Sequence, residues 1–211
     1  MMIDKFKYSR EDIGDTNIFL LKVSDNLECI SKNIIPNSQL LDIKQYKLEH
    51  DRNKRLLSRS FLYTYLKNKY QIESFDLEYN KYKKPYLKSN KNIDFSISYS
   101  KDYILVAVSD KYKIGVDIEY IDKDINHNEL KNIVMHQNEI KHYNQLKTEE
   151  DKLGFFFEVF NIKESIIKSM GMGLYFDVKS ISILTISGKY LFKDIFNISF
   201  FKTSLYTISN I

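Results

Sequence analysis

Apolar side chains recur at the spacing of an α-helix in the two longest patterned segments of the chain. In the first, Leu57, Phe61 and Tyr65 stand four residues apart, so they share one helical face. In the second, Thr148 can cap the N-terminus, and Gly171 suits the left-handed residue that often ends a helix. Helices are therefore predicted over residues 36–70 and 148–170, with a polar helix, broken once, over 127–145.

Other segments alternate apolar and polar residues with the period of a β-strand, most clearly over residues 93–99. The runs at 103–109 and 113–119 are separated by a short turn and predict a hairpin. Further strands are expected over residues 3–8, 16–24 and 75–79, and three or four more over 178–209.

This order of elements predicts an α+β fold made of two similar halves, residues 1–112 and 113–211. Each half would place a long helix on a small antiparallel sheet. The two halves are expected to pack together with pseudo-two-fold symmetry, and a monomer is expected.

Composition limits the class of protein. The chain has 211 residues, 43% hydrophobic and 28% charged, which is ordinary for a globular protein. Its single cysteine excludes disulfides within the chain, and its four histidines lack the spacing of metal ligands. The N-terminus lacks a signal-peptide pattern and no stretch approaches the length of a membrane span, so a cytoplasmic location is expected. The net charge of +4 fits an acidic partner or a polyphosphate ligand, or merely a surface coated with lysine.

Two carboxylates lie close together in residues 114–119, Ile-Gly-Val-Asp-Ile-Glu. On a strand, Asp117 and Glu119 would share one face, about 6.6 Å apart along the backbone. Mg²⁺ prefers hard oxygen ligands and usually takes one or two carboxylates together with water and substrate phosphate. The pair fits such a site as well as it fits the solvated face of an edge strand.

A third carboxylate and a lysine stand one helical turn apart near the end of the second long helix. Glu164 and Lys168 have the spacing of a routine surface salt bridge. However, they continue the row of Phe157 and Phe160 in a strongly apolar helix, where a partly buried charge needs a partner. A metal ion or a phosphate would serve, and Gly171-Met-Gly173 would let backbone approach a ligand or simply end the helix.

These motifs together resemble those of the 4′-phosphopantetheinyl transferase superfamily, in its long single-chain, surfactin-synthetase-activating type. Gly115–Glu119 is similar to the family's Gly-[Ile/Val]-Asp-[Ile/Val]-Glu strand. The end of the long helix, from Phe160 to Leu174, is similar to [Trp/Phe]-x-x-Lys-Glu-[Ser/Ala]-x-x-Lys-x-x-Gly-x-Gly-Leu. Weaker matches are Phe95–Ser100 to Phe-Asn-[Ile/Val]-Ser-His-Ser, Lys83–Pro85 to Gly-Lys-Pro, and Arg52–Ser58 to an Arg-rich helix ending in Leu-Leu-Gly.

The resemblance implies an enzyme, a holo-[acyl-carrier-protein] synthase. It would transfer the phosphopantetheine arm of coenzyme A to a serine of an apo acyl or peptidyl carrier protein and release 3′,5′-ADP. The co-substrate would be coenzyme A, the metal Mg²⁺ with Mn²⁺ as an alternative, and the partner an acidic carrier of fatty-acid, polyketide or peptide synthesis. No nucleic acid and no membrane would be involved.

The resemblance also assigns roles to residues. Asp117, Glu119 and Glu164 would hold the metal, and Lys168 would neutralise the α-phosphate as the P–O bond breaks. Glu164, or a water on the metal, would take the proton of the carrier serine. Coenzyme A would be bound by Lys84, Ser98, Tyr99 and Arg55, together with Asp117 and Lys168.

Four positions depart from the family pattern. Tyr99 stands in place of histidine and Met172 in place of a common lysine, and each lost cationic contact would weaken coenzyme A binding by about 1.5–3 kcal/mol. Phe160 and Asn161 replace the usual tryptophan and serine or threonine. Lys83, Lys101 or Lys163 could compensate for the lost charge.

Two other interpretations remain open. The departures at Tyr99 and Met172 are compatible with a non-catalytic homologue that binds coenzyme A or a carrier protein. The basic helix over residues 44–59 is compatible with a nucleic-acid binder, although no nucleic-acid-binding signature accompanies it.

Overall fold

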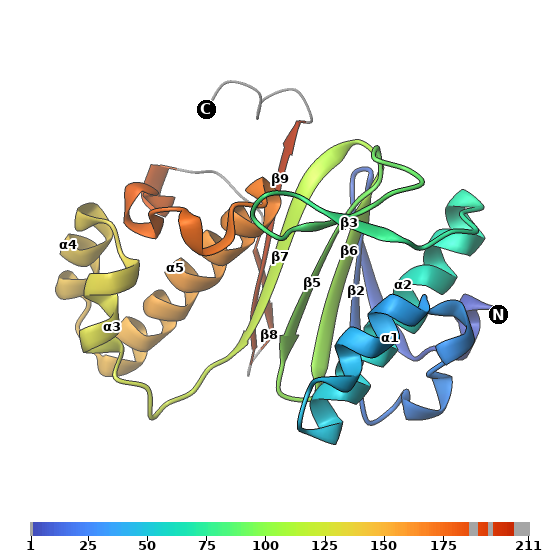
Figure 1. Ribbon diagram of the computed structural model, residues 1–211. Coiled ribbons are helices and arrows are strands. Elements are labelled where there is room, and N and C mark those ends of the chain that lie inside the picture. Colours follow the sequence, from blue (N-terminus) through green and yellow to red (C-terminus); the bar gives the residue numbers. More distant parts are fainter. Residues whose placement is uncertain (1, 186–189, 194–195, 205–211) are drawn as a thin grey trace. The chain divides into compact units, whose positions relative to one another are not determined.

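Two compact units make up the chain (Figure 1). The computed structural model describes residues 2–185, 190–193 and 196–204. The first unit covers Met1–Asn80 and Pro85–Lys111, and the second covers Lys81–Lys84 and Tyr112–Ile211.

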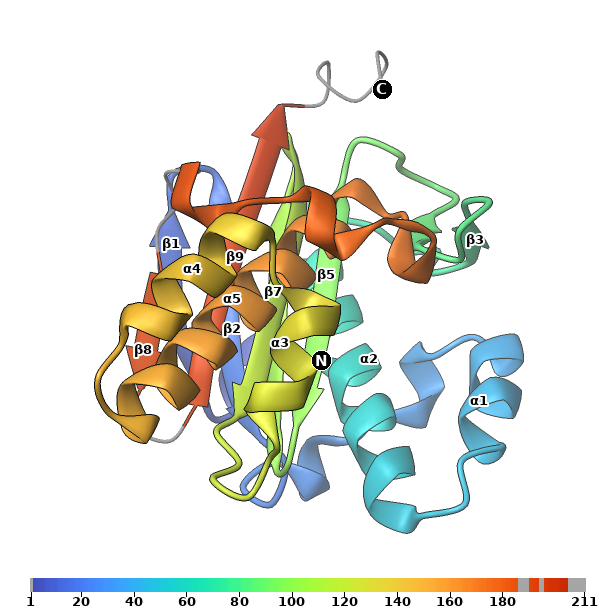
Figure 2. The ribbon, with the colours of Figure 1, turned by 90° about the vertical axis from the view of Figure 1, so that its left-hand side faces the viewer.

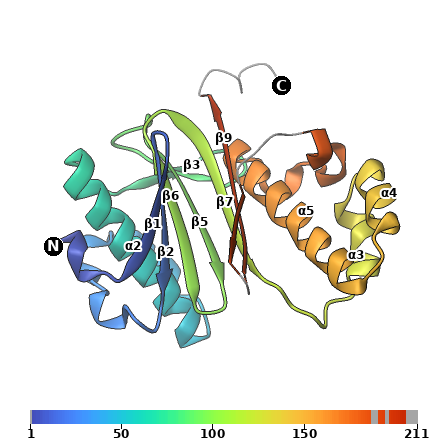
Figure 3. The same ribbon diagram turned by 180° about the vertical axis from the view of Figure 1, so that it is seen from behind.

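The first unit is built on a four-stranded antiparallel sheet in the order β1-β2-β6-β5. The helix α2 packs on one face of this sheet (Figure 3), and α1 packs on α2. The sheet strands are β1 (Tyr8–Ile13), β2 (Thr16–Lys22), β5 (Asp94–Ser100) and β6 (Tyr103–Ser109); β3 (Leu77–Tyr79) and β4 (Pro85–Leu87) form a separate pair; the helices are α1 (Asn37–Lys44) and α2 (Glu49–Tyr70), with 3₁₀ turns at Ile3–Lys5, Leu27–Cys29 and Lys32–Ile34.

The core of the first unit confirms the helical face predicted from the sequence. Leu57, Phe61 and Tyr65 are all buried. The Phe61 ring meets those of Phe6 and Phe19 edge-on, with centroids 5.3 and 5.0 Å apart. Such aromatic contacts add about 0.5–1.5 kcal/mol each to the burial of the rings, so this face of α2 anchors the helix to the sheet.

The predicted helix over 36–70 is wrong in one respect, because the chain breaks it into α1 and α2. The break has a local cause. Arg52 donates hydrogen bonds of 2.8 Å to the carbonyl oxygens of Tyr46 and Lys47. A side chain of the second helix thus satisfies carbonyl groups that a continuous helix would have paired internally.

The second unit layers helices on a three-stranded sheet of order β7-β9-β8. Helix α5 packs on β7 and β9, and α3 and α4 lie on the side of α5 that faces away from β7 (Figures 1 and 2). The elements are β7 (Tyr112–Tyr120), α3 (His127–Val134), α4 (Gln137–Gln145), α5 (Glu149–Met170), β8 (Tyr190–Lys193) and β9 (Phe196–Ser204), with 3₁₀ turns at Gly173–Tyr175, Val178–Ser180 and Ile183–Thr185.

Local chemistry explains the ends of α5, which the sequence predicts correctly. The Thr148 hydroxyl accepts the backbone N–H of Asp151 at 3.0 Å. Gly171 ends the helix in the left-handed conformation, with φ of 67°. The break in the polar helix over 127–145 is confirmed as well, since α3 and α4 are separate.

Three strand predictions are wrong. Residues 3–8 do not form a strand, because Ile3–Lys5 is a 3₁₀ turn and β1 begins only at Tyr8. The strands over 103–109 and 113–119 exist, but they do not form a hairpin: β6 pairs with β2 and β5, and β7 pairs with β9. Strand pairing depends on distant partners, which the local pattern does not identify. Residues 178–185 form 3₁₀ turns rather than strands. In the rest of the predicted 178–209 region, residues 186–189, 194–195 and 205–209 lie outside the described residues.

The α+β class is confirmed, because each unit sets a 22-residue helix on an antiparallel sheet. The pseudo-two-fold packing of the halves stays a prediction. Among the described residues, no helix combines the length and apolar character that a membrane crossing needs.

Candidate active site

Strand β7 and helix α5 touch at Gly115, the first residue of the Gly-Val-Asp-Ile-Glu motif. A Cβ atom at Gly115 would lie 1.8 Å from the backbone oxygen of Ser165 and 2.5 Å from the backbone nitrogen of Ser169. No side chain fits in that space, so glycine is required for the strand to lie against the helix. The hydroxyl groups of these two serines donate hydrogen bonds to carbonyl groups of their own helix.

This close contact brings Asp117 to Lys168. The Lys168 Nζ donates to Asp117 Oδ1 at 2.5 Å, and the carboxylate is almost fully buried while the lysine side chain is 31% exposed. A buried carboxylate needs a cation beside it. The lysine supplies that charge and still faces solvent, where a substrate can reach it.

Glu164 lies one turn before Lys168 and is half-buried. Burial raises the pKa of its carboxyl, the positive charge of Lys168 opposes this rise, and the negative charge of Asp117 adds to it. The two carboxylates therefore lie close enough to repel each other. Asp117 and Glu164 together carry two negative charges, and Lys168 neutralises only one of them. The remaining negative charge favours the binding of a further cation.

The fourth predicted residue, Glu119, lies two positions after Asp117 on β7 and is half-buried. By the alternation of a strand it projects to the same face as Asp117. Within residues 2–185, 190–193 and 196–204, however, no three or more acidic, histidine or cysteine side chains are grouped closely enough to hold a metal ion. The structure thus brings together Asp117, Glu164 and Lys168, while a three-carboxylate metal site stays a prediction.

The donor set nevertheless fits a divalent cation. Asp117 and Glu164 offer hard carboxylate oxygens and repel each other electrostatically. Mg²⁺ takes one or two carboxylates and completes its coordination with water and phosphate.

Lys84 reaches the same strand–helix contact. Its Nζ donates to the backbone oxygens of Ile114 at 3.2 Å and of Ser169 at 3.3 Å. The predicted role was to bind a coenzyme A phosphate. That role stays a prediction, whereas the two hydrogen bonds show that this lysine ties β7 to the end of α5.

One pair of residues near the site was missed by sequence reasoning. Lys163, beside Glu164, and Glu139 on α4 are both fully buried, with Nζ and Oε2 2.6 Å apart. The ammonium also donates to the Val134 oxygen, and Glu139 accepts the backbone N–H groups of His136 and Ile183. Lys163 therefore holds α5 against α4. It does not face outward, so it does not replace the positive charges that are missing at Tyr99 and Met172.

Burial lowers the pKa of Lys163, and the hydrogen bond and charge of Glu139 oppose that shift. The sequence contained one usable signal. In an apolar helix, a lysine at a position surrounded by buried residues needs an acidic partner elsewhere in the fold.

Two of the residues predicted to bind coenzyme A, Arg55 and Tyr99, lie close together in the first unit. The Arg55 guanidinium lies 3.7 Å from the centre of the Tyr46 ring and 5.1 Å from that of Tyr99. The Tyr99 hydroxyl shares a 2.7 Å hydrogen bond with Ser58. Arg55 and the two tyrosine rings border a cavity of about 330 Å³. Its lining residues are Gln39, Asp42, Ile43, Tyr46, Arg55, Arg59, Tyr79 and Tyr99.

Arg59, Tyr46 and Tyr79 were not among the predicted binding residues. Arg59 could have been found from its spacing, because it follows Arg55 by one helical turn. Ser98 is buried on β5, and by strand alternation its side chain lies on the face opposite to that of Tyr99. The structure therefore groups Arg55 with Tyr99 and separates Ser98 from them.

Comparison with known proteins supports the family resemblance. A family model described as the 4′-phosphopantetheinyl transferase superfamily matches residues 113–207, which include β7 and α5. The matched residues are similar to this superfamily and make up just under half of the chain. The resemblance to this superfamily is thereby confirmed over the matched region, whereas the roles of its site residues stay predictions.

Similar proteins carry the same family name. The chain is 29% identical over 154 residues to the 4′-phosphopantetheinyl transferase gsp of Aneurinibacillus migulanus, covering 72% of this chain. It is 26% identical over 144 residues to the 4′-phosphopantetheinyl transferase Sfp and 28% identical over 150 residues to the 4′-phosphopantetheinyl transferase ffp, both of Bacillus subtilis, each covering 66% of this chain. The matched region spans 62% of the length of each of these relatives.

Proposed function

We propose that the chain transfers the 4′-phosphopantetheine arm of coenzyme A to a serine of an apo acyl or peptidyl carrier protein and releases 3′,5′-ADP. The observation that carries the proposal is the meeting of Asp117, Glu164 and Lys168 where β7 crosses α5. The names of the similar transferases support it.

Lys168 is suited to stabilise charge on a phosphate. Its ammonium is held by Asp117 at one side and is partly exposed at the other. Phosphoryl transfer depends mainly on positioning and on neutralising charge at the phosphoryl group. As the serine oxygen bonds to phosphorus, the bond from phosphorus to the departing 3′,5′-ADP breaks, and Lys168 offsets the charge on the leaving phosphate.

Glu164 is suited to accept the proton that the serine hydroxyl gives up. Burial and the nearby Asp117 raise the pKa of its carboxyl. A carboxylate with a raised pKa is a stronger base and still holds the proton once it has been transferred. Glu164 thus takes the serine proton while the new bond to phosphorus forms.

Mg²⁺ would be held by Asp117 and Glu164, with Glu119 as the third carboxylate. When bound, it supplies positive charge to the pyrophosphate of coenzyme A. Glu119 lies on the strand face of Asp117, which supports its inclusion.

The nucleotide end of coenzyme A carries phosphate groups and an aromatic base. The cavity of the first unit offers Arg55 and Arg59 as cations and tyrosine rings as apolar surfaces. Arginine binds phosphate through its planar fork of N–H groups and stacks well on rings. We assign coenzyme A recognition in this unit to Arg55, Arg59 and Tyr99, and the partner to a carrier whose acidic surface complements the net charge of +4.

The test is the variant Glu164→Gln, which removes the base and a metal ligand at constant volume. Release of 3′,5′-ADP and labelling of an apo carrier should fall by at least about 100-fold, with an unchanged melting temperature. Glu158→Gln is the matched control, because Glu158 is a half-buried glutamate on the same helix whose pKa is also raised by burial. Turnover by Glu164→Gln equal to that of the control would remove Glu164 from the mechanism.

A second candidate is a homologue that binds coenzyme A or a carrier without catalysis, favoured by Tyr99 and Met172 in place of cationic family residues. Calorimetry with coenzyme A, run beside an assay of 3′,5′-ADP release, distinguishes the two. Binding with no release in the presence of Mg²⁺ and several apo carriers would favour this second candidate.

A further inference from the structure

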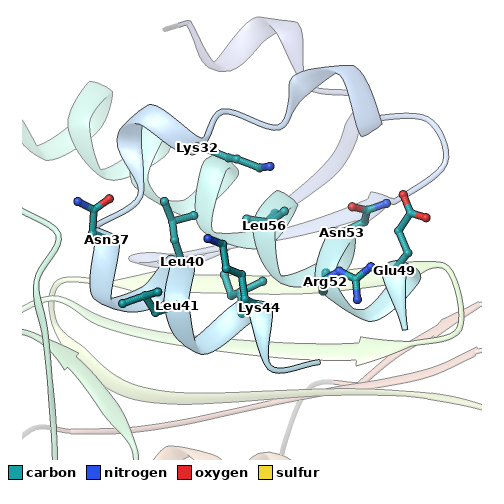
Figure 4. Close-up of a pocket in the computed structure, with 10 residues that line it drawn as sticks. Lys32, Asn37, Leu40, Leu41, Lys44, Glu49, Arg52, Asn53 and Leu56 are labelled. Carbon is teal, nitrogen blue, oxygen red and sulfur yellow. The ribbon is translucent and has the colours of Figure 1, made fainter. Parts of the chain in front are cut away.

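A second, larger cavity lies in the first unit on residues to which the proposed transfer gives no role. Its volume is about 670 Å³, within the range of small-molecule sites in proteins. It opens between α1, the start of α2 and the 3₁₀ turn at Lys32–Ile34 (Figure 4). The lining residues are Lys32, Asn37, Leu40, Leu41, Ile43, Lys44, Glu49, Arg52, Asn53 and Leu56.

The lining has two chemical characters. Leu40, Ile43 and Leu56 supply an apolar floor, and Leu41 adds an apolar side chain that is itself 60% exposed. An exposed leucine beside an open apolar cavity leaves surface that a ligand can bury, at about 25 cal/mol per Å².

The charges around this floor are unevenly placed. In Figure 4, Glu49 and Asn53 lie at one end together with Arg52, whereas Lys32 and Lys44 lie nearer the middle, beside Leu40. Neither of these two lysines makes an ion pair or side-chain hydrogen bond with any residue that the structure describes. Arg52, in contrast, is engaged with the carbonyls of Tyr46 and Lys47.

We propose that this cavity binds a small amphipathic anion, an alkyl chain that ends in a carboxylate. The chain would lie on Leu40, Ile43 and Leu56, and the carboxylate would lie between Lys32 and Lys44. This orientation is favoured over the reverse, because Lys32 and Lys44 supply two positive charges in the middle of the cavity, whereas at the other end Glu49 offsets the charge of Arg52. The site does not depend on the transferase activity, since it shares none of the residues assigned to catalysis.

The direct test is calorimetric titration of the intact protein with decanoate. Decanol and decyltrimethylammonium serve as neutral and cationic ligands with the same chain. We expect decanoate to bind most tightly, with an affinity that falls as salt is raised, because salt screens the exposed lysines. Equal affinity for decanol, or no heat with decanoate, would overturn the proposal.

Three exposed-site variants make the test specific. Lys44→Glu and Lys32→Glu should each weaken decanoate binding about tenfold. Each variant loses one attraction to the carboxylate of decanoate and gains a repulsion from the new glutamate. Leu41→Trp should abolish binding by filling the cavity from an exposed position, with little effect on folding. Lys88→Glu makes the same charge change at an exposed lysine that does not line the cavity.

Loss of binding in Lys88→Glu equal to that in Lys44→Glu would mean that only the overall charge matters, and the site would be refuted. Unchanged binding in Leu41→Trp would also refute it. Binding of the protein to anionic lipid vesicles without binding of free decanoate would replace the small-molecule site with a membrane contact. None of these variants touches the proposed catalytic residues, so transfer to a carrier should proceed in all of them.

Discussion

Replacing Gly115 with alanine tests how the strand and helix of the candidate active site are held together. The added Cβ would lie 1.8 Å from the Ser165 oxygen, whereas an ordinary contact needs at least 3.4 Å. The strand and helix must therefore separate by roughly 1.5 Å, in an interior that is otherwise closely packed. The obstacle is backbone, which cannot rotate away as a side chain can.

Overpacking of a core costs about 1–3 kcal/mol and occasionally more. Because α5 and β7 must move as whole elements, we expect Gly115→Ala to lose about 3 kcal/mol of unfolding free energy. For a chain of this length, that loss lowers the melting temperature by about 6–12 °C. The separation also draws Lys168 from Asp117, so the transfer rate at low temperature should fall even while the protein remains folded.

Gly154→Ala is the matched control, because Gly154 is on the same helix and is exposed, and a methyl group added there would meet no atom within 4 Å beyond the adjacent backbone of its own helix. Alanine there should stabilise the helix by about 0.8–1.0 kcal/mol and raise the melting temperature by about 2–4 °C. Both variants are measured by circular dichroism during heating. A Gly115→Ala protein that melts as high as Gly154→Ala would refute the close contact on which the site depends.

Three further changes probe other parts of the account. Lys163→Met leaves Glu139 buried without its cation and should cost about 3–5 kcal/mol in urea unfolding; a loss below about 1 kcal/mol would contradict a fully buried ion pair. Lys168→Met should lower kcat for carrier modification by about 100-fold or more, and an unchanged kcat in a folded variant would remove this lysine from catalysis. Arg55→Ala should weaken coenzyme A binding by about 1.5–3 kcal/mol with little change in melting temperature, and equal affinity would show that the nucleotide binds elsewhere.

Local chemistry made part of the fold predictable from the sequence. The ends of α5 depend on Thr148 and Gly171, which act within a few residues of themselves. The buried face of α2 follows from the spacing of its apolar residues. These features need no knowledge of distant partners.

Features that depend on distant partners were not predictable in the same way. Strand β7 pairs with β9, about 80 residues further along the chain, whereas the local pattern favoured the neighbouring strand as its partner. The division between α1 and α2 is local, but it involves a side chain rather than the helical repeat, because Arg52 donates to carbonyl groups that precede its own helix. Neither interaction leaves a periodic signal.

The candidate site likewise has residues that were predictable from local motifs and residues that were not. The acidic residues and Lys168 were predicted from their motifs, and the structure brings Asp117, Glu164 and Lys168 together. The role of Gly115 was missed because the chemistry of its motif lies in the carboxylates, and the need for glycine becomes clear only where α5 crosses it. The Lys163–Glu139 pair was missed because its members stand on different helices.

The measurement that tests the central claim most directly is labelling of apo carrier proteins with fluorescent coenzyme A, followed on a gel with Mg²⁺ or with EDTA. We predict a labelled carrier and an equal amount of 3′,5′-ADP with Mg²⁺, and neither product with EDTA or in Glu164→Gln. Labelling that continues undiminished in EDTA would contradict the role of Asp117 and Glu164 as metal ligands. No labelling of any acyl or peptidyl carrier in Mg²⁺ would contradict the proposed transfer itself.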